Sequence, residues 1–292
     1  MNGISLIIIT HNRKLDLKRT LEKLDLLNKP KNFEIIVIDQ NSTDGTEELF
    51  DSYFSNVRYE KLNVNLGVAG GRNKGVELAN YEYMVFLDDD AEFLSPNALT
   101  QIEKKFEINK GINILAFKIY NNNFDLYNWA YPKRLLKLQD KDFYTNMYIG
   151  CGHAIRKSFF LSVNGYSNNL FFWGEEIELS LKSFAYNNSP VLYTGDIQVL
   201  HRVTPKGRIS EKNGRYYYKV RNRLAIINNI YPTPFRQLYN LFYLCAYGVK
   251  SLLIKTTKQY LSGLKDYKSV KMDVNRRINL RSLIKYIFIH YI

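Results

Sequence analysis

Cysteine is scarce in this sequence: Cys151 and Cys245 are the only two in 292 residues. Two thiols cannot form the disulfide network that holds small secreted domains together, and they fit a reducing compartment. A chain of this length can instead bury a substantial core without cross-links. Its hydrophobic share of 46% and charged share of 24% are ordinary for a globular protein and exclude a wholly disordered or fibrous chain.

Long apolar runs are missing as well. The nearest approach, residues 238–254, is interrupted by Asn240 and Lys250, and the short apolar run at residues 4–9 follows no basic segment. The sequence therefore predicts neither a membrane-spanning helix nor a secretory signal. We expect a cytoplasmic protein that can rest on the inner face of the plasma membrane without crossing it.

Acidic residues are in deficit, and the deficit is uneven. The formal charge is +13, from 41 Lys and Arg against 28 Asp and Glu, and residues 231–292 carry +9 of it. Such a surplus is compatible with nucleic acid, an anionic membrane or phosphorylated substrates. Across residues 235–292 aromatic, aliphatic and basic residues interleave, which favours an interfacial helix on anionic lipid. A helical segment that completes the core or forms an oligomer fits this pattern equally well.

Short apolar runs alternate with helical patterns over the first hundred residues. Strands are predicted at 4–9, 33–39, 57–62 and 83–87, and helices at 14–27, from 42 toward 54, near 79 and from 95 onward. This alternation indicates βαβ units and a mostly parallel sheet in an α/β fold. After Pro232 the pattern predicts helices with apolar and basic faces.

Polar or small residues follow each predicted strand. The four groups are Thr10–Arg13, Asp39–Ser42, Asn65–Gly67 and Asp88–Asp90. Ligands of open parallel sheets bind beyond these carboxyl ends, so the four groups together predict a binding site. There, Asp39 is suited to accept hydrogen bonds from a ribose or a base.

The third group continues into a glycine-rich stretch, with glycines at 67, 70, 71 and 75. Glycine lets the backbone approach a ligand closely, and Arg72 and Lys74 between these glycines could meet phosphate. A tight loop without any ligand is the alternative.

The run Asp88-Asp89-Asp90 is the strongest single signal. Adjacent carboxylates repel by about 1 kcal/mol per pair even at high dielectric, and a divalent cation removes that cost. In an extended chain Asp88 and Asp90 point the same way and can reach one Mg²⁺, which prefers carboxylates together with substrate phosphates. The alternative is a solvated acidic loop.

A second acidic group follows the aromatic run 171–173. Glu175, Glu176 and Glu178 would lie in the first turn of a helix, where the helix dipole alone favours acids. A glutamate beside large aromatic residues also loses hydration, so its pKa rises and it can serve as a general base.

Further along, His201 follows an apolar stretch and is either a third metal ligand, a diphosphate contact or an ordinary strand-end residue. Five basic residues then follow between 202 and 215, namely Arg202, Lys206, Arg208, Lys212 and Arg215. A mobile basic loop could close over a leaving diphosphate, although a solvated loop fits as well. Cys151 and His153 could form a nucleophilic pair, but their small and apolar surroundings favour a packed turn. The motifs GxxxxGK[ST], HExxH and CxxC do not occur.

Taken in order, the segments SLIIITHNR, IIVIDQNSTDGT, NVNLGVAGGRNKG, YMVFLDDD, GCGHAIRKSFF, FFWGEEIELSLK and VLHR resemble inverting glycosyltransferases of family 2 with the GT-A fold. The resemblance covers residues 4–223. The NxGxAGGxNxG variant is similar to the branch with bacterial rhamnosyl- and galactofuranosyltransferases of surface polysaccharides.

The resemblance implies a GT-A catalytic domain at 1–230, with a nucleotide-sugar half at 1–110 and an acceptor half at 111–230, followed by the helical basic tail 231–292. It implies a donor site made of Thr10, Asn12, Arg13, Asp39, Asn41, Asn65, Gly67, Gly71, Arg72, Asn73, Asp88 and Asp89. Acceptor-side residues would be Gly150, Cys151, Gly152, His153, Trp173 and Gly174. Asp88, Asp90 and His201 would hold Mg²⁺ or Mn²⁺.

The family's base usually lies in an ED-x-D motif, which here is Glu175-Glu176-Ile177-Glu178. Glutamate thus replaces aspartate at the expected base, Glu176, and Glu175 remains a substitute. The implied reaction moves a sugar from a UDP- or dTDP-linked donor to a glycan or a polyprenyl-linked acceptor.

Three alternatives stay open. They are a nucleotide-sugar-binding protein without turnover, a sugar-phosphate nucleotidyltransferase that uses the aspartate run on a triphosphate, and a basic nucleic-acid module. The sequence carries no RNA- or DNA-binding motif, so we expect no nucleic-acid partner.

Overall fold

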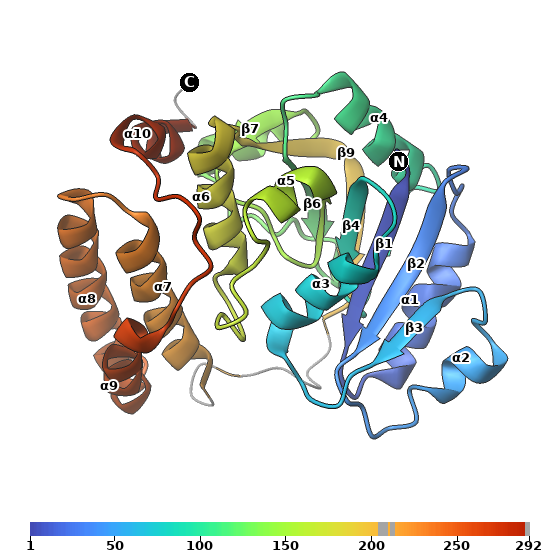
Figure 1. Cartoon of the computed structure of the whole chain (residues 1–292), viewed down its shortest axis with the longest axis horizontal. Coiled ribbons are helices and arrows are strands. Elements are labelled where there is room, and N and C mark those ends of the chain that lie inside the picture. Colours follow the sequence, from blue (N-terminus) through green and yellow to red (C-terminus); the bar gives the residue numbers. More distant parts are fainter. Residues whose placement is uncertain (204–209, 211–213, 290–292) are drawn as a thin grey trace.

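Figure 1 shows the computed structural model, which describes residues 1–203, 210 and 214–289. In this part of the chain nine strands form one sheet in the order β3-β2-β1-β4-β8-β6-β9-β5, and β7 pairs with β9. The strands are β1 (Ile4–Thr10), β2 (Phe33–Asp39), β3 (Arg58–Lys61), β4 (Tyr83–Leu87), β5 (Ala91–Phe93), β6 (Ile114–Tyr120), β7 (Phe143–Thr145), β8 (Gly152–Arg156) and β9 (Val191–His201).

Helices flank this sheet and continue beyond it. They are α1 (Lys14–Asp25), α2 (Glu48–Ser52), α3 (Gly67–Leu78), α4 (Ala98–Ile108), α5 (Lys157–Ser162), α6 (Glu175–Asn187), α7 (Tyr216–Ile230), α8 (Phe235–Leu253), α9 (Thr257–Asp266) and α10 (Leu280–Phe288), with short 3-10 turns η1 (Lys133–Leu138) and η3 (Tyr267–Ser269). The expected α/β class and the helical C-terminal extension are confirmed.

The sheet has two halves with different strand directions. Strands β3, β2, β1 and β4 run parallel, and all four were predicted. The interiors of β1, β2 and β4 are buried and mostly apolar, whereas β3 at the edge is largely exposed. Beyond β4 the sheet is mixed, because β8 runs antiparallel to both β4 and β6, while β6 and β9 are parallel. The prediction of a mostly parallel sheet therefore holds for the first half only. This arrangement brings the end of β9 to the carboxyl end of β4.

The glycine-rich stretch is a helix rather than a turn. Helix α3 begins at Gly67 and includes all four glycines. A Cβ added at Gly71 would lie 2.9 Å from the Gln40 side chain, and one at Gly75 would collide with Ile7 of β1. Here the missing side chains let α3 pack directly onto β1 and β2, so the close approach is to the sheet and not to a ligand.

The C-terminal extension is divided in its packing. Helix α10 packs against the α/β body, since Asn146 Nδ2 donates to Tyr286 O at 2.8 Å and Ser282 Oγ donates to Asn188 at 2.6 Å. Helices α8 and α9 instead pack against α7, and α8 lies at the edge of the molecule opposite to β3 and α2 (Figure 1). None of the described helices has both the length and the apolar character needed to cross a bilayer.

Candidate active site

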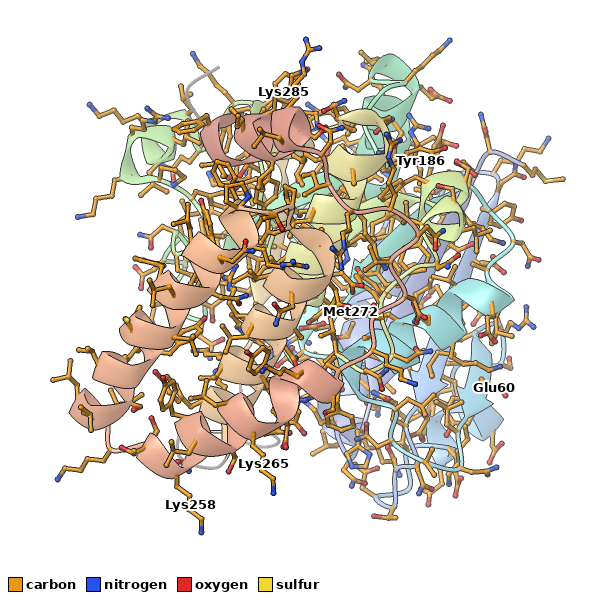
Figure 2. All side chains as sticks on the ribbon, turned by 60° about the vertical axis from the view of Figure 1, so that its left-hand side comes forward. Glu60, Tyr186, Lys258, Lys265, Met272 and Lys285 are labelled. Carbon is orange, nitrogen blue, oxygen red and sulfur yellow. The ribbon has the colours of Figure 1, made fainter. Side chains whose placement is uncertain are left out.

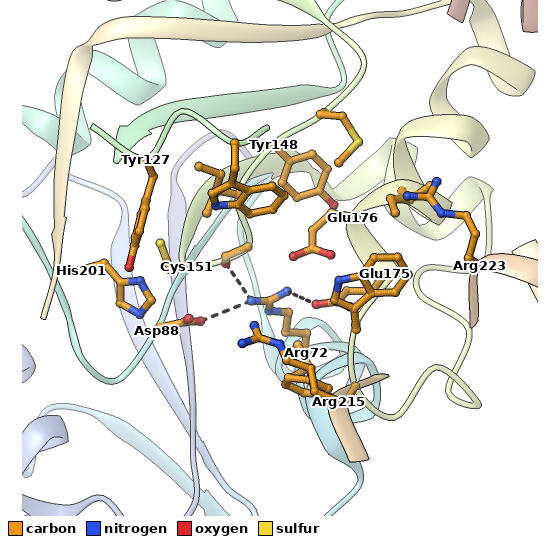
Figure 3. Close-up of a pocket in the computed structure, with 18 residues that line it drawn as sticks. Arg72, Asp88, Tyr127, Tyr148, Cys151, Glu175, Glu176, His201, Arg215 and Arg223 are labelled. Carbon is orange, nitrogen blue, oxygen red and sulfur yellow. Dashed lines mark hydrogen bonds and ion pairs between the residues drawn. The ribbon is translucent and has the colours of Figure 1, made fainter. Parts of the chain in front are cut away.

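One cavity of about 430 Å³ opens where several elements meet at the carboxyl end of β4 (Figure 3). Asp88 follows β4, His201 ends β9, the 147–151 segment leads into β8, and Glu175 and Glu176 begin α6. The lining residues are Val68, Arg72, Asp88, Tyr127, Trp129, Met147, Tyr148, Ile149, Gly150, Cys151, Phe172, Trp173, Glu175, Glu176, Ile177, His201, Arg215 and Arg223. The cavity therefore joins the two acidic groups that the sequence places about 85 residues apart.

At one side of the cavity, Asp88, Asp90 and His201 form a compact donor set. Their ligand atoms all lie within 4.8 Å of one another. Carboxylate oxygens together with an imidazole nitrogen are a donor set that divalent first-row cations accept, so these residues fit the expected Mg²⁺ or Mn²⁺. The register of the sheet explains the meeting, because β5 pairs with β9 and places Ala91 opposite His201.

Asp90 is surrounded by cations. Arg13 Nη2 lies 2.7 Å from one of its oxygens and His201 Nε2 lies 3.0 Å from the other. Burial alone would raise the pKa of Asp90, but the hydrogen bond and charge of His201, together with Arg13, lower it. Burial likewise lowers the pKa of His201, and its neighbours Cys151 and Asp90 more than offset this and raise it to about 12. Asp90 is therefore kept ionised.

Asp89, the middle residue of the run, turns into the interior. Thr10 Oγ1 donates to it at 2.8 Å, and Arg13 Nε lies 3.2 Å from its other oxygen. Burial is the main cause that raises its pKa to about 8. The structure thus uses Asp89, Thr10 and Arg13 to tie β1 to the end of β4, and does not bring them into the cavity. The alternation expected of an extended chain accounts for this separation of Asp89 from its two neighbours.

Across the cavity, Glu175 and Glu176 occupy the first turn of α6. The turn before them is tight, with Trp173 at φ 70° and Gly174 at φ 102°, a conformation that favours glycine at the helix start. Asn222 of α7 holds this turn by donating to the carbonyls of Phe172 at 2.9 Å and Trp173 at 2.6 Å. The local sequence therefore aims the first carboxyl groups of α6 at the cavity.

The two glutamates differ in their contacts. Glu175 is buried, and Arg72 Nη1 lies 3.3 Å from one of its oxygens. Glu176 is half-buried, and its carboxyl lies so close to Gly150 that a Cβ there would come within 2.5 Å of it. Burial raises the pKa of both, and repulsion from Glu176 helps to raise that of Glu175 to about 8. Raised pKa values are what a general base near neutral pH needs.

Glu178, the third acid of the motif, has a structural role. It is fully buried, accepts hydrogen bonds from the backbone N–H and the hydroxyl of Ser167, and pairs with Lys182 at 2.9 Å. Its charge is compensated locally, and it does not line the cavity.

Arg72 lies between the two acidic sides (Figure 3). Its guanidinium donates to Gly150 O at 2.7 Å and lies 3.3 Å from both Asp88 and Glu175. Burial lowers the pKa of Arg72, but Tyr166 and the nearby acids raise it overall, so it stays charged. The sequence interpretation had Arg72 next to a diphosphate; the structure shows that it also connects the metal-side carboxylate to the helix that carries the glutamates.

The remaining donor-side residues shape the strand-end loops. Asp39 is buried, and its two oxygens accept from Ser42 N at 2.8 Å and Tyr59 OH at 2.6 Å. Asn12, at φ 55°, accepts from Thr43 N at 2.7 Å, while Asn41 is exposed at φ 65°. These contacts hold the loops after β1 and β2 against each other.

Two asparagines do the same around α3. Asn65 accepts a hydrogen bond from Gly67 N at 2.8 Å. Asn73 donates a hydrogen bond to Tyr166 O through its amide nitrogen and accepts one from Tyr166 N through its oxygen. Gly67 and Gly71 serve close packing, as described above. None of these residues, nor Asp39, Asn12 or Asn41, lines the 430 Å³ cavity.

On the acceptor side, Gly150, Cys151 and Trp173 line the cavity, while Gly152, His153 and Gly174 do not. His153 is fully buried, stacks on Phe86 at 5.0 Å and lies 3.1 Å from Tyr166 OH. Burial lowers the pKa of His153, whereas it raises that of the Cys151 thiol. A thiolate nucleophile needs the opposite, so the packed-turn interpretation of this segment is the better one.

Several lining residues were missed by sequence reasoning. They include Tyr127, Tyr148 and Arg223 of α7, whose segments carry no motif that indicates a site. Phe172 belongs to the aromatic run before the glutamates and lines the cavity as well. Of the expected basic loop, Arg215 lines the cavity, whereas Arg202 forms a buried ion pair with Glu92 at 2.7 Å. Lys206, Arg208 and Lys212 lie outside the described residues.

Comparisons with known proteins agree with this geometry. The model of the family described as "Glycosyl transferase family 2" matches residues 5–162. A GalNAc(5)-diNAcBac-PP-undecaprenol beta-1,3-glucosyltransferase of Campylobacter jejuni is 33% identical over 116 residues, which are 37% of this chain and 36% of that protein. The match thus spans only about a third of that curated relative.

Two solved structures share the fold at low identity. Staphylococcus aureus TarS 1–349 in complex with UDP-GlcNAc has a TM-score of 0.64 at 16% identity, covering 99% of this chain and 86% of that one. A mannosyltransferase from Pyrobaculum calidifontis in complex with GDP-Man and Mn²⁺ has a TM-score of 0.60 at 12% identity, covering 99% and 79%. At these identities the likeness establishes the fold alone.

Proposed function

The chain belongs to glycosyl transferase family 2, and from this premise we propose that it is a metal-dependent inverting glycosyltransferase. It moves a sugar from a nucleoside-diphosphate donor to a hydroxyl of a cell-surface glycan or of a lipid-linked acceptor, at the cytoplasmic face of the membrane. One observation carries the proposal: Asp88 and His201 of the donor set line the same cavity of about 430 Å³ as Glu175 and Glu176, and the ligand atoms of Asp90 lie within 4.8 Å of those of Asp88 and His201.

In this proposal Asp88, Asp90 and His201 hold the cation. When bound, Mg²⁺ or Mn²⁺ supplies positive charge for the departing diphosphate. Asp90 is suited to this role because Arg13 helps to keep it ionised, and His201 would ligate as a neutral imidazole. The nucleoside part of a UDP- or dTDP-linked donor would lie over the loops after β1 and β2, in the half formed by residues 1–110. The solved relatives bound to UDP-GlcNAc and to GDP-Man with Mn²⁺ support a donor of this class.

Glu176 is the proposed base. It removes the proton from the acceptor hydroxyl, whose oxygen then attacks the anomeric carbon from the side opposite to the diphosphate. A single displacement of this kind inverts the anomeric centre and needs only one base, unlike glycoside hydrolysis with its two carboxyl groups. Glu176 is favoured over Glu175 because Arg72 pairs with Glu175 at 3.3 Å and Glu175 is buried, whereas Glu176 is half-buried and lines the cavity (Figure 3).

The acceptor would enter beside Trp173, Tyr148 and Gly150, in the half formed by residues 111–230. Aromatic rings with a few polar groups are the usual lining of a sugar or small-molecule site. Arg72 lies 3.3 Å from both Asp88 and Glu175, so the proposed metal side and base side are close to one guanidinium, and this proximity supports an in-line attack within the cavity.

A panel of nucleotide sugars tests the proposal. Thermal unfolding of the purified protein in Mn²⁺ should shift upward with one class of donor, and that donor should release nucleoside diphosphate when acceptor glycans are added. Binding without transfer or hydrolysis would instead identify a nucleotide-sugar-binding protein. Diphosphate release from a nucleoside triphosphate and a sugar phosphate would identify a nucleotidyltransferase.

A further inference from the structure

Helix α8 has two apolar faces, and only one of them is covered. Its inner face packs Tyr243, Leu244 and Tyr247 against α7. Its outer face carries six large apolar side chains that are 59–77% exposed, and we call them the outer stripe: Leu238, Leu241, Phe242, Val249, Leu252 and Leu253. Their spacing of three, four and seven residues places them on one side of the helix.

The outer stripe runs along most of the helix rather than forming an isolated spot. Cys245 and Ala246 lie between its members. A shallow hollow of about 530 Å³ is lined by these two residues and by four of the stripe, namely Leu238, Leu241, Phe242 and Val249. Contiguous apolar surface of this extent marks an interaction site on a folded protein, because leaving it in water is unfavourable. Residues in the described part of the chain do not cover it.

The charges around the stripe indicate what covers it. Helix α8 contains no acidic residue, and three lysines near its C-terminal end are exposed: Lys250 within α8, Lys255 just after it and Lys258 in the first turn of α9. None of these three lysines forms an ion pair with a described residue. Figure 2 shows Lys258 and Lys265 of α9 pointing away from the body of the molecule. An apolar stripe bordered by unpaired cations matches a surface with an apolar interior and anionic headgroups.

A second copy of the chain is a poorer occupant. Pairing two outer stripes would bring together two extensions that each carry +9 over residues 231–292. Like charges at that separation oppose association, whereas an anionic bilayer gains from the same charges.

We propose that α8 docks the protein on an anionic lipid bilayer, with the outer stripe among the acyl chains and the lysines at the headgroups. The inference deepens the proposed function, because it rests on a lipid-linked acceptor for its purpose. A structural link supports that purpose: Arg223 of α7 lies 4.9 Å from the Tyr243 ring of α8 and 5.4 Å from the Trp173 ring of the cavity. The helix that meets the bilayer is thus packed, through one arginine, against the proposed acceptor wall.

Vesicle flotation of the full-length chain tests the docking. Wild-type protein should float with vesicles of phosphatidylcholine and phosphatidylglycerol in equal parts, and much less with phosphatidylcholine alone. The variant Leu241→Glu/Phe242→Glu should bind both kinds of vesicle at least about tenfold more weakly, because two side chains would carry charge into the acyl region. Lys250→Glu/Lys258→Glu should lower partitioning about tenfold on the anionic vesicles only.

A matched control is Leu15→Glu/Leu161→Glu, since Leu15 of α1 and Leu161 of α5 are 81% and 56% exposed but lie outside the stripe. This control should float like wild type. Flotation of Leu241→Glu/Phe242→Glu at the wild-type level would overturn the proposal. So would a wild-type dimer in sedimentation velocity that this variant converts to monomer, with no vesicle binding by either.

A failure of the docking proposal can be distinguished from a failure of the proposed function. None of the substituted side chains lines the 430 Å³ cavity. Donor-induced thermal stabilisation, measured on the same samples, should therefore be equal in all variants. Loss of flotation with intact donor binding reports on docking alone, and flotation without any donor binding in wild type contradicts the proposed function alone.

Discussion

The two acidic sides of the cavity are built from the same chemical group but are held in opposite electrostatic states. Asp90 has Arg13 and His201 as direct partners, and its pKa is lowered. Glu175 and Glu176 are buried next to each other with Arg72 as the nearby cation, and their pKa values are raised. Environments that push the pKa values of nearby carboxyls apart assign them different tasks. One side is suited to hold a cation, and the other to accept a proton.

The two acidic sides of the cavity are also connected through one side chain. Arg72 touches Asp88 on one side and Glu175 on the other, and it is itself fixed by the carbonyl of Gly150. Substitutions of the metal ligands, of the base or of Arg72 should therefore each alter the difference between the two sides in a distinct way.

Removing a carboxylate from the cation side should have the largest effect. Asp90→Ala should lower metal-stimulated transfer about a thousandfold or more, because the cation contributes several kcal/mol of charge stabilisation. Initial rates across a Mn²⁺ titration measure this. Asp16→Ala is the matched control, since Asp16 also pairs with Arg13 at 3.0 Å but lies outside the donor set. Full wild-type activity in EDTA would refute the metal role.

Neutralising the base side should have the next largest effect. Glu176→Gln keeps the shape of the side chain and should lower kcat about 100- to 1,000-fold while donor affinity is retained, because only proton removal is lost. Donor binding by calorimetry and transfer by product analysis separate the two. Glu175→Gln should have the smaller effect of the pair. If the two results were reversed, Glu175 would be the base.

Replacing the connecting arginine should affect both sides moderately. Arg72→Lys should lower kcat/KM about 10- to 100-fold, because an ammonium group cannot match the planar, multi-donor geometry that reaches Asp88, Glu175 and Gly150 O together. Lys74→Ala on the same helix is the control, since Lys74 pairs with Glu77 at 2.7 Å and does not line the cavity. Wild-type kinetics in Arg72→Lys would show that the two sides act independently.

The pH dependence should report the base side alone. A general base works when ionised, so kcat should fall about tenfold for each pH unit below the apparent pKa. Because burial raises the pKa of Glu176, the proposed base, this acid limb should lie above the ordinary pKa of a glutamate. Glu176→Gln should abolish this limb, because the titrating carboxyl of the proposed base is removed. A limb that stays at the ordinary value for glutamate would contradict the role of burial.

Much of the fold was accessible from local patterns. The apolar runs of β1, β2 and β4 and the acids at the ends of β2 and β4 were predicted correctly, because nearly every residue of a short buried strand is apolar and the strand can be recognised from its own residues. The antiparallel direction of β8 was not predicted, since strand pairing depends on residues distant in sequence. The helical start of α3 was also missed, because its glycines are explained only by Ile7 and Gln40 on the strands beneath.

The candidate site shows the same division. The aspartate run and the glutamate motif could be recognised as separate acidic groups, but Asp89 and Glu178 could not be distinguished from their neighbours by type. Their burial against Thr10 and Arg13, and against Ser167 and Lys182, excludes them from the cavity.

The sequence by itself determined the α/β class, the family resemblance and the kinds of acidic group at the strand ends and helix start. Only the tertiary structure decided which carboxyls share a cavity, which are ionised, and that Arg72 joins them. The physical reason is that residue type sets what a group can do, whereas burial and charged neighbours, supplied by remote segments, set its protonation and its reach.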